Sequence, residues 1–81
     1  MPVRAYVLIQ TEVGQAGAVA KAIREIPGVE TSDDVTGPYD VIARATTDSI
    51  EELGRVVVTR IQMIEGISRT LTCPIVSGND F

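Results

Sequence analysis

The chain carries one strand–helix–strand pattern twice, and this internal repeat limits the fold more than any other feature of the sequence. The repeat is clearest in the segments 26–29 (IPGV) and 64–67 (IEGI), which lie 38 residues apart and each separate a helical pattern from a strand pattern. Within 81 residues, two such right-handed units interleave most economically as βαββαβ. We therefore predict an α+β, ferredoxin-like fold, with a four-stranded antiparallel sheet and two helices on one face.

The expected elements follow from the spacing of the apolar residues. Apolar residues at every second position indicate strands, and apolar residues at every third or fourth position indicate helices. Asp48 followed by Glu51 has the pattern of a helix N-cap with its capping-box partner. We expect one domain over residues 1–76 and a short C-terminal tail over 77–81. The pattern predicts strands at 3–10, 29–36, 41–46 and 67–75, and helices at 14–26 and 50–64.

Two helices on one face of the predicted sheet leave its other face uncovered. Tyr6, Leu8 and Ile42 fall at strand positions that point away from the predicted helices. The chain is 44% apolar, so its aliphatic residues can supply both a core and an interface. A small core and an exposed apolar face together favour a homodimer in which the two sheets pack face to face.

The composition argues against several classes of function. The chain has no His and a single cysteine, Cys73, which removes imidazole catalysis, an internal disulfide and the usual zinc ligand sets. Seven Lys and Arg against eleven Asp and Glu give a net charge of −4, which disfavours direct nucleic-acid binding. No apolar stretch has the length of a membrane span, and no signal-peptide pattern opens the chain. We expect a cytoplasmic protein with no metal site, no cofactor and no membrane contact.

Three segments in a fixed order carry a family resemblance. They are residues 26–29 (IPGV), 35–41 (VTGPYDV) and 64–72 (IEGISRTLT). Together they resemble the effector-binding domain of the Lrp/AsnC regulators, also called the RAM domain, and the resemblance covers the chain from Val3 to about Ile75. It implies a ferredoxin-like domain that dimerises through its sheets, assembles further into an octamer-like ring and binds a free amino acid between subunits.

The resemblance also carries one departure from the family pattern. Family regulators have an N-terminal helix-turn-helix domain before this module, whereas here the first strand pattern begins at Val3. We therefore expect an effector-sensing module without a DNA-binding domain. It would modulate its own oligomeric state, and full-length Lrp/AsnC regulators are its expected partners besides its own copies.

The resemblance places the ligand-binding site at the turn 36–40, where Gly37, Tyr39 and Asp40 match the family's Gly-x-x-Asp loop. It also implies that the neighbouring subunit supplies residues around 67–72, of which we select Thr72. The turn suits an amino-acid zwitterion, because Gly37 allows a close backbone approach and Asp40 can accept a hydrogen bond from an ammonium group. Tyr39 would wall the side-chain pocket. The alternative is an ordinary tight turn in which Asp40 only bonds neighbouring amides.

Three functions stay open from the sequence. The first is an amino-acid-binding module that is not an enzyme. The second is a small dimeric, cofactor-free monooxygenase or isomerase, whose chemistry would rest on Tyr6, Tyr39 or Asp40. The third is a ligand-free structural partner of full-length regulators. We favour the first, because the enzyme would have to work without any histidine.

Overall fold

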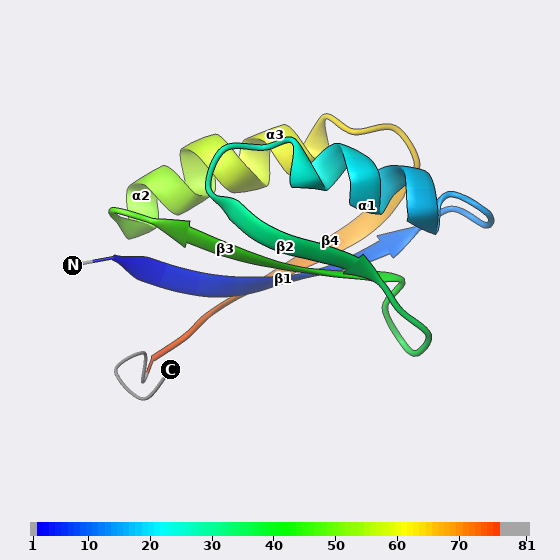
Figure 1. The fold of residues 1–81 in the computed structure, drawn as a ribbon, viewed down its shortest axis with the longest axis horizontal. Coiled ribbons are helices and arrows are strands. Elements are labelled where there is room, and N and C mark those ends of the chain that lie inside the picture. Colours follow the sequence, from blue (N-terminus) through cyan, green and yellow to red (C-terminus); the bar gives the residue numbers. More distant parts are fainter. Residues whose placement is uncertain (1, 77–81) are drawn as a thin grey trace.

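The computed structural model describes residues 2–76, and the predicted tail at 77–81 lies outside them. The strand order in the sheet is β2-β3-β1-β4, and all three neighbouring pairs are antiparallel. All helices lie on one side of the sheet (Figure 1). This confirms the predicted ferredoxin-like fold. The strands are β1 (Val3–Thr11), β2 (Val29–Asp34), β3 (Val41–Thr47) and β4 (Ile67–Pro74), the first helix is α1 (Ala16–Arg24), and the second joins α2 (Ile50–Glu52), the π-helical segment η1 (Leu53–Val58) and α3 (Thr59–Gln62).

The core lies between the sheet and the helices. Alternate residues of β1 and β3 point into it, as the period-two pattern predicts, and the helices meet them with their own apolar stripes. Nearly all of these side chains are fully buried, so the core has little room for repacking. The core consists of Ala5, Val7, Ile9, Val19, Ala20, Ile23, Ile26, Val41, Ala43, Ala45, Leu53, Val57 and Ile61.

The opposite face of the sheet, here called the open face, carries no helix. Leu8 of β1 lies between Ile42 of β3 and Leu71 of β4 in the strand register, and these three residues form an apolar row across the sheet. Ile42 is 36% exposed and Leu71 is 44% exposed. The predicted exposure of apolar residues on this face is confirmed for Ile42 and extends to Leu71.

Strand β4 differs from its simple alternating pattern. A bulge beside Gln10 and Thr11 shifts the register, so that Ile67 packs against the core while Leu71 and Cys73 point to the open face. Thr72 lies opposite the buried Val7 and therefore points to the helix side.

The second helix begins one residue later than its expected cap. Ser49, not Asp48, is the N-cap residue, and its Oγ accepts a hydrogen bond from the Glu52 N–H at 3.1 Å. The helix then widens into the π-helical segment η1, where the Thr59 hydroxyl also donates to the Gly54 carbonyl at 3.0 Å. Nothing in the apolar spacing indicated this widening. Helix α1 is shorter than the predicted 14–26 at both ends.

The internal repeat of the sequence is also present in the backbone, where two equivalent glycines adopt the same conformation. Gly28 follows α1 with φ +97° and Gly66 follows α3 with φ +94°, so both turns out of a helix need the left-handed region that favours glycine. At Gly28 a Cβ atom would lie 3.3 Å from the Thr46 carbonyl oxygen and 3.4 Å from a methyl of Val57. The turn is therefore tight against β3 and the second helix.

A glycine in a tight turn and a glycine within a helix should respond to alanine substitution with stability changes of opposite sign. We expect Gly28→Ala to lower the free energy of unfolding by about 1–2 kcal/mol, because a side chain there is strained and crowded. Gly17→Ala in α1 should raise it by up to about 1 kcal/mol, since its Cβ meets nothing within 4 Å and alanine favours helix. Urea unfolding followed by circular dichroism measures both. Equal effects of the two substitutions would contradict this account of the turn.

No helix within residues 2–76 is both long enough and apolar enough to cross a membrane.

Candidate ligand-binding turn

The turn between β2 and β3 is closed by its own backbone and tied to the neighbouring strand. The Val35 N–H donates to the Asp40 carbonyl at 2.8 Å, and the Asp40 N–H donates to the Ile9 carbonyl at 2.9 Å. The Gln10 side-chain amide donates to the Pro38 carbonyl at 3.0 Å. Strand β1 therefore holds the turn at both its base and its tip.

Asp40 is fixed by a hydrogen bond from β1. Its Oδ2 accepts the backbone N–H of Thr11 at 2.8 Å, in a half-buried position. This is the kind of amide contact that the ordinary-turn alternative assigns to Asp40. A carboxylate has about four acceptor positions, however, so one amide leaves capacity on the other oxygen. Asp40 is thus a held carboxylate with room for a second donor.

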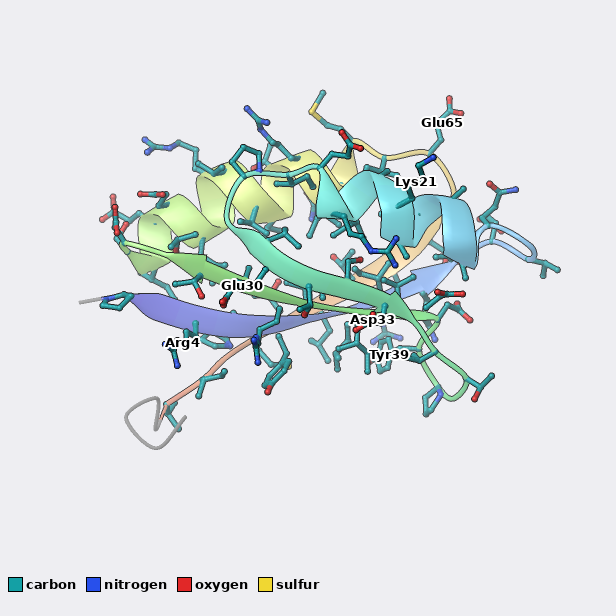
Figure 2. All side chains as sticks on the ribbon, viewed as in Figure 1. Arg4, Lys21, Glu30, Asp33, Tyr39 and Glu65 are labelled. Atoms are coloured by element: carbon teal, nitrogen blue, oxygen red, sulfur yellow. The ribbon has the colours of Figure 1, made fainter. Side chains whose placement is uncertain are left out.

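The tip of the turn leaves backbone donors free. Gly37 has φ +146°, a conformation that favours glycine, and its Cβ position is open space. Among residues 2–76, no acceptor receives the amides of Thr36, Gly37 or Tyr39. Tyr39 is half-buried and lies on the side of the sheet away from the helices (Figure 2). Free amides near a carboxylate are the groups that an amino acid needs.

A cavity of about 510 Å³ opens beside the turn, on its helix side. Asp34, Val35 and Thr36 line it from the chain that enters the turn, and Ala16 lines it from the start of α1. The N-cap residue of α1, Gln15, makes no side-chain cap hydrogen bond, and the first turn of the helix has no acidic residue. Its first amides therefore carry partial positive charge that no side chain satisfies.

The sequence analysis did not identify Asp34 or the start of α1 as part of this region. Only the fold brings the N-terminus of α1 next to residues 34–36. The one hint in the sequence is a helix start without Ser, Thr, Asp or Asn at its cap.

Within a single chain, Thr72 lies away from the turn 36–40. It faces a separate cavity of about 330 Å³ between β4 and the second helix, where its neighbours include Leu53, Val58 and Pro74. The family resemblance assigns Thr72 to the site of a neighbouring subunit, so its role there stays a prediction.

The acidic pair of β2 is split by the sheet. Asp33 lies opposite Ile42 on the open face, whereas Asp34 lies opposite the buried Val41 and points to the helix side. The two carboxylates therefore point to different faces and cannot chelate one ion together. Over residues 2–76, no three His, Cys, Asp or Glu side chains come together as a metal-ligand group.

Comparison with known sequences finds one family. A family profile described as the Lrp/AsnC ligand binding domain matches residues 4–78. A relative from Pyrococcus horikoshii, named as an uncharacterized HTH-type transcriptional regulator, is 35% identical over 54 residues, which is 67% of this chain and 36% of the relative. The match thus spans about a third of that relative's length.

Solved structures share the fold. The protein TTHA0845 from Thermus thermophilus is 37% identical, with a TM-score of 0.87 over 94% of this chain and 95% of that chain. AsnC from E. coli has a TM-score of 0.85 at 20% identity, over 95% of this chain and 52% of that chain. The first likeness extends over almost the whole of both chains, and the second concerns the fold alone.

Proposed function

The chain belongs to the Lrp/AsnC ligand-binding domain family, and from this premise we propose that it is an amino-acid-binding, effector-sensing module and not an enzyme. Domains of this family are regulatory parts of transcriptional regulators. The observation that carries the proposal is the turn 35–40, in which a held carboxylate lies near free backbone amides.

An α-amino acid would use both features of the turn. Its ammonium group would bind the free oxygen of Asp40, while the bond from Thr11 keeps that carboxylate in place. Its carboxylate would accept from the free amides of the turn, or from those at the start of α1 across the cavity. Tyr39 would contact the ligand side chain from the open-face side.

A structure with the same fold supports this ligand class. A transcriptional regulator from Neisseria meningitidis was solved as a complex with L-Met. It is 15% identical, with a TM-score of 0.80 over 95% of this chain and 51% of that chain. We extend amino-acid binding to this chain as a proposal, and the identity of the amino acid is left to experiment.

We propose further that the module works as a homodimer that assembles into an octamer-like ring. The apolar row of Leu8, Ile42 and Leu71 lies on the open face, where a second copy would remove it from water. Thr72 points to the helix side, so it would reach a neighbour's site through a further contact of the ring and not through the open face. A ligand bound between copies would favour the assembly that completes its site, and full-length Lrp/AsnC regulators are candidate members of such assemblies.

The proposal predicts selective stabilisation by free amino acids. At 100 times its dissociation constant, a ligand that binds only the folded state adds about 2.7 kcal/mol, which is several degrees of Tm for a small domain. We expect a melting screen of the twenty free amino acids to show such a rise for one or a few of them. No rise with any amino acid would contradict the proposal.

Asp40 variants test whether the turn is the site. Asp40→Asn keeps an oxygen that can accept the Thr11 amide but removes the charge, so the fold should survive while amino-acid affinity falls at least about tenfold. Asp40→Ala removes both, and should also lower the Tm of the free protein. If Asp40→Asn leaves the amino-acid response intact, the turn is structural and the site lies elsewhere. Turnover of an aromatic substrate would instead favour the enzyme alternative.

A further inference from the structure

The open face holds a cavity of its own, at the end of the sheet where β1 begins and β4 ends. It has a volume of about 250 Å³, close to the lower end of ligand pockets. Figure 2 shows two of its lining residues, Arg4 of β1 and Glu30 of β2, near this end of the sheet. The cavity is lined by Arg4, Tyr6, Glu30, Arg44 and Ile75.

The strand register assembles this cavity from three strands and the end of the fourth. Tyr6 of β1 lies directly opposite Arg44 of β3, and a register shift in β2 between Val29 and Thr31 places Glu30 near the same position. The Ile75 N–H donates to the Arg4 carbonyl at 2.8 Å, which fixes the end of β4 beside β1. No single stretch of sequence contains the site, and no motif marked it.

Glu30 lies beside Arg44 without using its hydrogen-bond donors. The Nε of Arg44 lies 3.8 Å from Oε1 of Glu30, which is too far for a hydrogen bond, and the Thr46 hydroxyl donates to that same oxygen. Within residues 2–76, the buried Nε of Arg44 has no hydrogen-bond partner. A guanidinium has five N–H donors in a planar fork, and the four on the exposed terminal nitrogens of Arg44 stay available to a ligand.

The charges of the lining favour an anion. Arg4 and Arg44 contribute two positive charges and Glu30 one negative charge, and over residues 2–76 the pair between Arg44 and Glu30 is the only ion pair. Arg4 therefore faces the cavity without a carboxylate from the described chain. Planar guanidinium groups bind carboxylates with two parallel hydrogen bonds, which is stronger and more directional than a contact to an ammonium group.

We propose that this cavity is a binding site for a small carboxylate, separate from the amino-acid turn. The carboxylate lies between the guanidinium groups of Arg4 and Arg44, the Tyr6 ring walls it, and Ile75 contacts its carbon atoms. The cavity is on the face that a second copy would cover, so the bound anion also neutralises positive charge at that interface. The cavity and the turn 35–40 share no residue, so either can bind a ligand without the other.

The test is calorimetric titration of the whole chain with succinate and with propionate, against sodium chloride at equal ionic strength. We expect saturable binding of a carboxylate that chloride does not reproduce. Arg44→Gln and Arg4→Gln should each weaken it about 10- to 100-fold, the effect of removing a charged hydrogen-bonding partner. Arg44→Lys keeps the charge but loses the fork, and should weaken it less than Arg44→Gln does.

Arg69→Gln is the matched control, because Arg69 lies opposite Gln10 on the same face and does not line the cavity. It should change the affinity less than about twofold, as should Asp40→Asn, which separates this site from the turn. Equal weakening by Arg69→Gln would mean general electrostatic attraction and would overturn the proposal. An absence of binding to both succinate and propionate would also overturn the proposal. If neither acid binds and Arg44→Gln only weakens dimerisation, an acidic residue of a second copy fills the cavity instead.

Discussion

Replacing Ile61 by alanine is expected to lower the free energy of unfolding by about 2–5 kcal/mol, a large share of the stability of a domain this small. Ile61 lies in α3, the last segment of the second helix, and its side chain is fully buried in the core between this helix and the sheet. The substitution removes three carbon atoms from a close-packed interior that cannot easily close around the gap. Urea unfolding followed by circular dichroism, at one fixed protein concentration, measures the change.

Met63→Ala is the control for this prediction. Met63 follows Ile61 by two residues but is 79% exposed, so its truncation should cost less than about 0.5 kcal/mol. The comparison isolates core packing, because Ile61 is buried within α3 while Met63, the C-cap residue of the same helix, is exposed to solvent. An Ile61→Ala variant no less stable than Met63→Ala would show that this core is not close-packed.

The parts of the fold that sequence predicts well are those set by local periodicity. The alternation in β1 correctly assigns Ala5, Val7 and Ile9 to the core, because a strand has only two faces and one of them must be buried. The segments at 26–29 and 64–67 correctly predict where each helix gives way to a strand, and the structure adds that each turn holds a glycine at positive φ. Such features depend on a few neighbouring residues and not on the rest of the molecule.

Features that depend on contacts between distant segments were not predicted. The bulge in β4 is set by its pairing with β1, so the alternation of residues 67–75 alone gave no warning that Ile67 and Leu71 would point to opposite faces. Cap selection failed for a different reason. Asp48 and Ser49 are both good N-caps, and the choice between them depends on where β3 ends.

The candidate site also has one part that local sequence predicts and another part that depends on contacts between distant segments. The turn itself can be predicted from the sequence, because Gly37 and Asp40 are residue types that favour tight turns. The hydrogen bond from Thr11 to Asp40 crosses 29 residues of sequence, and the cavity beside α1 needs two segments that only the fold brings together. The open-face cavity that contains Arg4 and Arg44 is the hardest to predict from sequence, since its lining comes from β1, β2, β3 and the residue directly after β4.

If the module assembles through its open face, as we propose, a charge placed in the apolar row should disrupt that assembly. Leu71 is the best position for the test, because it is 44% exposed and lies beside Leu8 on an edge strand. An aspartate at Ile42 would instead face Asp33 across the strand pair and would also strain the single chain. Leu71→Asp leaves the core unchanged.

We expect Leu71→Asp to break the face-to-face contact between two copies, so that the mass of the assembly falls at micromolar concentration while each chain stays folded. Burying an unpaired carboxylate costs several kcal/mol, and a symmetric dimer buries two, so the dissociation constant should rise by more than about a hundredfold. Light scattering coupled to gel filtration measures the mass, and circular dichroism checks the fold. Val13→Asp is the control, because Val13 is fully exposed in the loop before α1 and should leave the mass unchanged. If Leu71→Asp keeps the parental mass, the open face is not the dimer interface, and the apolar row then needs a different partner.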